Sequence, residues 1–498
     1  MRFNRTIVSS LVLAILITMT GCGSSSNGTS TTTPPPSTTN QWTWESGSNT
    51  ASTQTSAQPG VYGTLGVAAA GNVPGGRAGA VSWTDSSGNL WLFGGDGNDS
   101  TGTSGLLNDL WEFNLSSKEW TWVSGSNLNG HAGVYGAAAG NVPGSRSNAV
   151  SWIDSSGNLW LFGGIGYGSN YGIPGYLNDL WEFSPASKQW TWVSGSNSTL
   201  PDPYTNFYGT LGIAAASNMP GGRAGAVSWV DRSGNLWLFG GWGYDASGLK
   251  GDLNDLWEFN PATDEWIWQS GSQFVGTTGG QGQPGVYGTL GVAAAGNVPG
   301  GRDEAVGWVD SSGKLWLFGG EEYYYGGNYE DPNDLWEFDT VSKEWTWQGG
   351  INPVGSYLPN STVGVSGVYG TLGVAAAGNM PGSRVGAVSW IDSSGKLWLF
   401  GGVEYGPAGY VGLINDLWKF DPAAKEWTWV NGTDSVSSQG GALGVNGTLG
   451  VAAAGNVPSG RASSVSWTDN SGNLWLFGGV GAGPTLGVYL NDLWKYQP

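Results

Sequence analysis

One segment recurs six times along the chain, and this repetition constrains the fold more than any other feature of the sequence. Segments similar to "RAGAVSWTDSSGNLWLFGG" each begin at an arginine, namely at Arg77, Arg146, Arg223, Arg302, Arg384 and Arg461. Successive arginines are 69, 77, 79, 82 and 77 residues apart. Such regular spacing predicts an array of similar structural units rather than one irregular domain.

Each unit contains four short segments that are typical of β-strands. In the first unit they are "RAGAVSW", "NLWLFGG", "LNDLWEF" and "EWTWVSG", called a, b, c and d below. The a–b and c–d links are short and contain Gly, Ser, Asn or Asp, which suit tight hairpin turns. Segment b is apolar on both faces, because Leu90 and Leu92 alternate with Trp91 and Phe93. Four antiparallel strands covered on both faces predict the blade of an all-β propeller.

Composition agrees with this fold class and excludes others. The 498 residues include 89 Gly and 31 Trp, which fit many turns around a large core and exclude a disordered chain. Lys and Arg number 18 against 37 Asp and Glu, a net charge of −19. This negative field repels phosphate backbones, so we expect no nucleic-acid partner.

The end of segment b and the segments that follow it resemble the Kelch repeat. In the first unit, Gly94 and Gly95 end the second strand, and six residues separate Phe113 from Trp120. The same spacing recurs at Phe183 and Trp190, Phe259 and Trp266, Phe338 and Trp345, and Phe420 and Trp427. The resemblance covers residues 42–498 and implies a six-bladed Kelch-type β-propeller, similar to the central domain of galactose oxidase.

The sixth unit has no d segment of its own. It reaches "LNDLWKY" at 490–496 and then Pro498, whereas an isolated "WTW" stands at 42–44, before the first unit. We therefore expect the strand from Trp42 to Trp44 to complete blade six and close the ring, which leaves no exposed sheet edge. With this strand each blade has five tryptophans, and only Trp242 lies outside the pattern.

The N-terminus predicts export. Arg2 and Arg5 precede an uncharged, mostly apolar stretch over 7–20, the layout of a secretory signal. The residues "MTGC" that end at Cys22 resemble the bacterial lipoprotein cleavage box, which implies that Cys22 is the acylated first residue of the mature chain.

These features divide the chain into three parts. We expect a lipoprotein signal peptide at 1–21, a lipid-anchored Ser/Thr/Pro-rich linker at 22–41 and the propeller at 42–498. The expected location is the bacterial cell envelope, at the outer membrane or cell surface, with the lipid as the only contact with the membrane.

Candidate ligand-binding residues lie in the b–c loops. In an up-and-down blade these loops share one face with the d–a links, and they differ from blade to blade, as binding loops do. Aromatic rings stack on sugar faces and carboxylates accept hydrogen bonds from hydroxyls. The candidates are Trp242, Tyr244, Glu321, Glu322, Tyr323, Tyr324, Tyr325 and Tyr405. We expect an extracellular ligand, most readily a carbohydrate; a protein-interaction scaffold and purely structural loops are the alternatives.

Residues repeated in every blade are interpreted as structural. The d–a links share versions of "GVYGTLGVAAAGNVPGGR", and their tyrosines are Tyr62, Tyr135, Tyr208, Tyr287 and Tyr369. A ring of equivalent sugar sites between blades is the alternative for these tyrosines. One arginine and one aspartate per blade predict buried, hydrogen-bonded supports; the aspartates are Asp109, Asp179, Asp255, Asp334, Asp416 and Asp492.

Catalysis and cofactors receive little support from the sequence. The copper chemistry of galactose oxidase requires imidazoles and a Cys joined to a Tyr, whereas this chain has one histidine, His131, and one cysteine, Cys22. We therefore expect neither a cofactor nor copper oxidase activity. The oxygen-rich "DGNDSTG" at 96–102 is a candidate calcium loop. Glu321 and Glu322 would be the acidic groups of a sugar hydrolase or mutarotase, and no residue is assigned to catalysis.

Overall fold

The computed structural model describes residues 39–48, 58–136, 140–169, 172–199, 207–276, 282–324, 328–352, 364–405, 411–435, 441–481 and 487–498. At 323–324, 328–330, 405 and 411 it describes the backbone alone. A compact unit spans Thr38–Pro498. All regular secondary structure in the described residues is β, which confirms the predicted fold class. None of these residues forms a helix that is long and apolar enough to cross a membrane.

The predicted a, b, c and d segments form antiparallel sheets with that strand order. The a strands are β3 (Val81–Thr84), β8 (Val150–Ile153), β15 (Val227–Val230), β22 (Val306–Val309), β29 (Val388–Ile391) and β36 (Val465–Thr468). The b strands are β4 (Leu90–Asn98), β9 (Leu159–Phe162), β16 (Leu236–Phe239), β23 (Leu315–Phe318), β30 (Leu397–Phe400) and β37 (Leu474–Phe477). The c strands are β5 (Ser104–Asn114), β12 (Leu180–Ser184), β19 (Leu256–Asn260), β26 (Leu335–Asp339), β33 (Leu417–Asp421) and β40 (Leu493–Gln497). The d strands are β6 (Glu119–Ser124), β13 (Gln189–Ser194), β20 (Glu265–Ser270), β27 (Glu344–Gly349), β34 (Glu426–Asn431) and β1 (Gln41–Ser46).

Smaller antiparallel sheets lie at the b–c loops and position the candidate site. In each, the strand of the repeated arginine pairs with the first end of a b–c loop, which in turn pairs with the second end. In blade one these pairings are continuous with the main sheet through β2 (Arg77–Ala78). The separate ones are β7 (Arg146–Ser147) with β10 (Ile165–Gly166) and β11 (Gly175–Tyr176), β14 (Arg223–Ala224) with β17 (Trp242–Tyr244) and β18 (Lys250–Asp252), β21 (Arg302–Asp303) with β24 (Glu321–Tyr324) and β25 (Asn328–Glu330), β28 (Arg384–Val385) with β31 (Val403–Tyr405) and β32 (Val411–Leu413), and β35 (Arg461–Ala462) with β38 (Val480–Gly481) and β39 (Val488–Tyr489).

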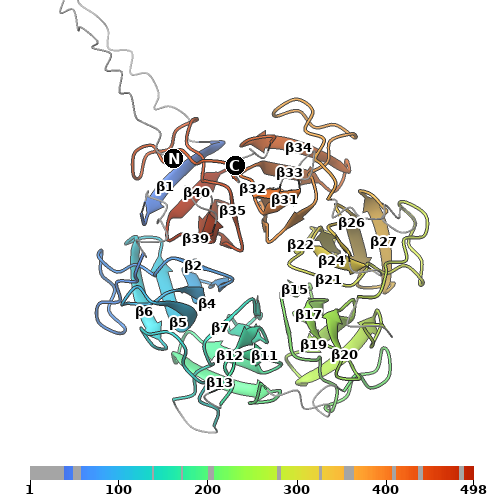
Figure 1. Ribbon diagram of the computed structural model, residues 1–498, viewed down its shortest axis with the longest axis horizontal. Coiled ribbons are helices and arrows are strands. Elements are labelled where there is room, and N and C mark those ends of the chain that lie inside the picture. The colour runs from blue at the N-terminus through green and yellow to red at the C-terminus, as the bar shows by residue number, and fades with distance from the viewer. Residues whose placement is uncertain are drawn as a thin grey trace, which may run out of the picture. The chain divides into compact units, whose positions relative to one another are not determined.

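The repeated tryptophans connect neighbouring sheets, which are arranged around a common centre (Figure 1). The indole N–H of each a-strand tryptophan donates to the backbone carbonyl of the b-strand tryptophan in the next sheet along the chain. Trp467, in the last of these a strands, donates to the carbonyl of Trp91 in the first sheet at 2.9 Å. Leu90 and Leu92 pack into one apolar cluster and Trp91 and Phe93 into the next, as the two-sided pattern of segment b predicts.

The N-terminal strand lies in the same sheet as the C-terminal strand. β1 pairs antiparallel with β40, with Trp42 opposite Tyr496 and Trp44 opposite Trp494. Figure 1 shows β1, in blue, beside β40, in red. Glu45 of β1 forms ion pairs with Lys495 of β40 and with Lys118 of the first blade. The strand therefore contacts both the last blade and the first.

The repeated arginine and aspartate form a buried ion pair in each blade, as predicted for structural supports. In the first five blades the tyrosine of the d–a link joins this pair, whereas the sixth link has Asn446 at the equivalent position. In the first blade, both terminal nitrogens of Arg77 donate to the Asp109 carboxylate at 2.7 Å. The Tyr62 hydroxyl donates to the same carboxylate at 2.6 Å, and the Trp111 indole does so at 2.7 Å. Because the carboxylate is buried but fully hydrogen-bonded, it holds strands a and c and the d–a link together.

The d–a links protect the outer sheet edges. The links before blades one, three, four and five run along the d strand of the same blade; for example, the amide of Gly66 donates to the carbonyl of Trp122. The link before the last unit covers β1 in the same way, because Gly450 donates to the carbonyl of Trp44. These links therefore occupy hydrogen-bonding groups that would otherwise pair with another chain.

Candidate functional site

A channel runs between the a strands along the centre of the unit. Its wider part has a volume of about 430 Å³ and is lined by the Ser, Thr, Gly, Trp, Ile and Val residues that end the a strands. The part toward the b–c loops is narrower, about 230 Å³, and is lined mainly by Ala, Val and Ser. Neither set of lining residues includes a charged group. Charge is found at the mouth beyond the narrow part, on the face of the b–c loops.

Six residues that lie two positions after the repeated arginines surround this mouth. They are Gly79, Asn148, Gly225, Glu304, Gly386 and Ser463, and each donates its amide to the carbonyl of another member, which forms a continuous circle of hydrogen bonds. All six have positive φ angles, with +49° at Glu304. A left-handed conformation favours glycine and is disfavoured for a glutamate, so Glu304 stores local backbone strain at this position.

The Glu304 side chain extends across the mouth. Its Oε1 accepts a hydrogen bond of 3.1 Å from the side-chain amide of Asn148, two blades away. A Cβ at Gly386, in the next blade on the other side, would lie 3.2 Å from Oε2. Gly225 lies between Glu304 and Asn148, and its lack of a side chain leaves room for this contact. The carboxylate is therefore presented on the axis of the channel.

Four further carboxylates gather beside Glu304, three from the same blade and one from its neighbour. Asp303 and Glu321 are direct cross-strand partners in β21 and β24, so their side chains lie on the same face of the small sheet. Asp331 follows β25, whose Glu330 pairs with Glu322. The neighbouring blade contributes Asp252 from β18, a strand that contacts β24.

Burial and mutual repulsion raise the pKa values of this group. Burial raises the pKa of Asp303 well above its usual range, and Asp252, Glu304, Glu321 and Asp331 add to the effect. The pKa values of Glu304 and Glu321 are also raised by burial. The pKa of Asp331 rises to about 7, because the carboxyl group is buried and stands near Glu321. Proton uptake and release in this group therefore extends toward neutral pH.

An aromatic cluster borders these carboxylates. The rings of Tyr176 and Tyr244 meet edge to face with centroids 5.9 Å apart, and the Trp242 indole hydrogen-bonds the Tyr176 hydroxyl. Trp242 is opposite Asp252 in the β17–β18 pair, and Lys250 lies with its ammonium 5.3 Å from the centre of the Tyr176 ring. Burial raises the pKa of Tyr176, and the nearby Tyr244 and Asp303 raise it further. The three rings are only partly buried, so they can contact a ligand.

The structure brings together part of the set predicted from the sequence. Trp242, Tyr244 and Glu321 lie in the site described above, whereas Glu322 points away from it. Glu322 is only 2% exposed and lies 3.5 Å from Arg302, where it supports the buried network. The strand backbones of Tyr323, Tyr324 and Tyr405 are placed in β24 and β31. Tyr325 and Cys22 lie outside the described residues.

Sequence reasoning missed Asp303, Glu304, Asp331, Asn148 and Tyr176. A signal was present for the first two, because blade four reads "RDEAVGW" where blade one reads "RAGAVSW". Only the fourth unit has carboxylates at these positions. Asp303 and Glu304 were not predicted as site residues because segment a recurs in every unit and was interpreted as structural.

The candidate calcium loop and the single histidine are engaged in local contacts. Asp99 accepts hydrogen bonds from the amides of Thr101, Thr103 and Asn129, so its oxygens face N–H donors. The His131 ring hydrogen-bonds the Ser126 hydroxyl at 2.8 Å. In the described part of the chain, no three Asp, Glu, His or Cys side chains converge as metal ligands.

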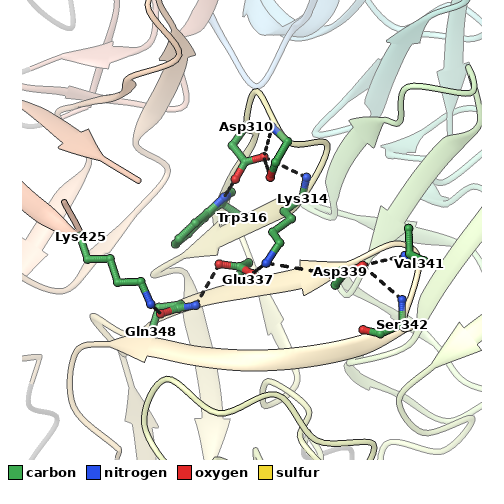
Figure 2. A network of polar contacts seen from close by, with 10 residues as sticks. Asp310, Lys314, Trp316, Glu337, Asp339, Val341, Ser342, Gln348 and Lys425 are labelled. Atoms are coloured by element: carbon green, nitrogen blue, oxygen red, sulfur yellow. Dashed lines mark hydrogen bonds and ion pairs between the residues drawn. The ribbon is translucent and has the colours of Figure 1, made fainter. Parts of the chain in front are cut away.

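In blade four, carboxylates on the opposite face have cationic or amide partners, as Figure 2 shows. Glu337 forms an ion pair with Lys314 and accepts a hydrogen bond of 2.9 Å from Gln348. Lys425, from the next blade, donates to Gln348 at 2.8 Å. The contrast with the channel mouth is plain: among the described residues, Asp303, Glu304, Glu321 and Asp331 form no ion pair with Lys or Arg.

A match to a family model agrees with the repeats in the first part of the chain. Residues 64–209 match the family model described as KLHDC2/KLHL20/DRC7 Kelch-repeats domain. The search of curated proteins finds no match. The solved structure of YjhT is 16% identical, with 87% of this chain and 95% of that chain covered and a TM-score of 0.47. The segment matched by the family model contains the first two repeats, which therefore resemble Kelch repeats, and the same four-stranded sheet recurs in each later unit.

Proposed function

We propose that this chain is an exported, lipid-anchored protein whose six blades form a closed ring that binds a carbohydrate at the mouth of the channel. The pairing of β1 with β40 and the hydrogen bond from Trp467 to Trp91 support ring closure. Export and anchoring at Cys22 are supported by the signal layout of the N-terminal sequence. The Kelch propeller itself is a scaffold for binding ligands or proteins.

The observation that carries the carbohydrate proposal is the placement of aromatic rings beside carboxylates at one mouth of the channel. Trp242, Tyr176 and Tyr244 offer partly exposed ring faces for the apolar C–H surface of a sugar. Glu304 and Glu321 offer acceptor oxygens for its hydroxyl groups. Trp242 is the one tryptophan that the repeated packing of the blades does not require.

Binding of soluble glycans by the purified protein tests this proposal. We expect saturable binding to at least one polysaccharide or oligosaccharide, measured by titration calorimetry, and a loss of about tenfold or more in affinity for Trp242→Ala. Phe207→Ala is the matched control, because Phe207 is an aromatic residue that is 54% exposed on a d–a link. Full affinity in Trp242→Ala, or equal losses in the two variants, would contradict the assignment of the site.

A protein partner is the second candidate, favoured by apolar residues on the outer links. Leu65 and Val67 are 53% and 51% exposed, and the later links carry similarly exposed residues at Leu211 and Ile213, Leu290 and Val292, Leu372 and Val374, and Leu449 and Val451. Repeated apolar patches of this kind suit a protein surface better than a sugar. If a protein binds there, Leu290→Asp together with Leu372→Asp should abolish its binding and leave glycan binding unchanged.

A further inference from the structure

The carboxylates at the channel mouth have an unbalanced charge. Elsewhere in the fold the repeated aspartate of each blade is matched by the repeated arginine, as Asp334 is by Arg302 at 2.6 Å. At the mouth, Asp303, Glu304, Glu321 and Asp331 come together, and none of the four has an ion-pair partner within the described ranges. Gathering four acidic groups without a cation is unfavourable, so a cationic ligand would relieve the repulsion.

Asp331 provides an independent indication of a ligand. Asp331 is only 4% exposed, yet among the described residues neither of its carboxylate oxygens has a hydrogen-bond partner. Asp331 interacts electrostatically with both Asp303 and Glu321, so its carboxyl group lies next to the other carboxylates of the channel mouth. A buried carboxyl group without any partner is rare in a folded protein.

The surrounding groups favour an organic cation over a metal ion. The described acidic side chains do not converge as metal ligands; they are spread along β21, β24 and the residue after β25. Aromatic rings border them, and the ammonium of Lys250 already lies 5.3 Å from the centre of the Tyr176 ring. Carboxylates combined with aromatic faces are the usual surroundings of a bound ammonium group.

We propose that the channel mouth recognises a protonated amino group on its ligand, and that the glycan it takes is one with free amino sugars. This inference rests on the proposed carbohydrate function and narrows its substrate class. The amino group is placed between Asp303, Glu321 and Asp331, while the sugar ring lies against Trp242. A neutral sugar of the same shape would leave the acidic group uncompensated.

Titration calorimetry of the full mature protein at pH 6.5, where the amino groups of a glucosamine oligomer are mostly protonated, tests the inference with four probes. They are an oligomer of glucosamine, its fully N-acetylated analogue, a cello-oligosaccharide of the same length, and spermidine, an amine without a sugar. We expect the glucosamine oligomer to bind about tenfold tighter than either neutral oligomer, because a partly buried charge pair contributes about this factor. We expect spermidine to bind measurably, and more weakly than the glucosamine oligomer.

Two double variants, each of which removes two negative charges, test whether the preference for the glucosamine oligomer arises at the channel mouth. Asp303→Asn with Glu321→Gln should bring the affinities for the charged and neutral oligomers within about twofold of each other. Glu337→Gln with Asp339→Asn, on the face shown in Figure 2, should keep the tenfold preference. Circular dichroism and melting curves establish that both variants are folded.

The outcomes separate the two proposals. Equal affinity of the wild type for all three oligomers would overturn the amine inference while leaving carbohydrate binding in place. Binding of spermidine that is lost only in the Asp303/Glu321 variant, without binding of any oligomer, would support recognition of the amino group and contradict the carbohydrate function. A preference lost equally in both variants, or no binding of either amine, would overturn the inference.

Discussion

Trp42→Ala tests whether the N-terminal strand closes the ring. Trp42 is 0% exposed and lies between two blades, because its ring centroid is 5.4 Å from that of Phe400 in blade five and 5.0 Å from that of Tyr496 in blade six. Its strand, β1, is held to β40 by backbone pairing from Gln41 to Ser46. No short hairpin connects β1 to β40, in contrast to the d strands of the other blades.

The expected loss of stability follows from the buried ring. Truncating a fully buried tryptophan costs about 3–5 kcal/mol, since the transfer of the ring and the cavity both contribute. The entropy of unfolding is about 2 cal/mol/K per residue, or roughly 1 kcal/mol/K for a unit of this size. We therefore expect the melting temperature of Trp42→Ala to fall by about 3–5 °C.

Trp190→Ala is the matched control, and hydrogen exchange separates closure from simple loss of packing. Trp190 occupies the same d-strand position in blade two and is 4% exposed, so a similar fall in melting temperature is expected. Only Trp42→Ala should accelerate amide exchange in β40, because only there does a strand distant in sequence hold the c strand. An unchanged melting curve for Trp42→Ala, or unchanged exchange at Trp494 and Tyr496, would refute the closure argument.

Two further predictions concern the acidic mouth. Glu304→Gly should raise the melting temperature by about 1 °C, because glycine adopts the left-handed conformation without strain, and should weaken glycan binding in the same protein. For Asp331, burial raises the folded-state pKa to about 7, above the ordinary value of 3.8, so the folded state binds this proton more tightly than the unfolded state. Protonation of Asp331 stabilises the folded state fully below about pH 4, and this stabilisation is lost as the pH rises through about 7. The free energy of unfolding falls by about 4 kcal/mol over this range. Between pH 4 and pH 8 the melting temperature of the wild type should therefore fall about 4 °C further than that of Asp331→Asn, and parallel pH profiles would contradict this.

Much of the fold could be predicted because each unit repeats its own chemistry. Alternation in segment b placed Leu90 and Leu92 in one cluster and Trp91 and Phe93 in another. One arginine and one aspartate per blade, with a tyrosine in five of the six links, predicted the buried network that Arg77, Asp109 and Tyr62 form. The contacts of this network are made within one blade, and the apolar clusters recur between each blade and its neighbour, so the repeated sequence is sufficient to predict both.

The candidate site was predicted only in part. Trp242 was found because it departs from the tryptophan count, and Glu321 because it lies in a variable loop. Glu322 follows Glu321 directly, yet it faces Arg302, since neighbouring residues on a strand point to opposite faces. Which of the two acids reaches the mouth depends on the pairing of β21 with β24.

The sequence by itself determined the all-β class, the four-stranded unit and the residues that support each unit, because those interactions are local and recur with the repeat. Only the tertiary structure decided which departures from the repeat act together. Asn148 and Glu304 are 156 residues apart in sequence and meet at 3.1 Å across the channel. They meet because the blades surround one axis, which brings equivalent positions of distant units to the same mouth.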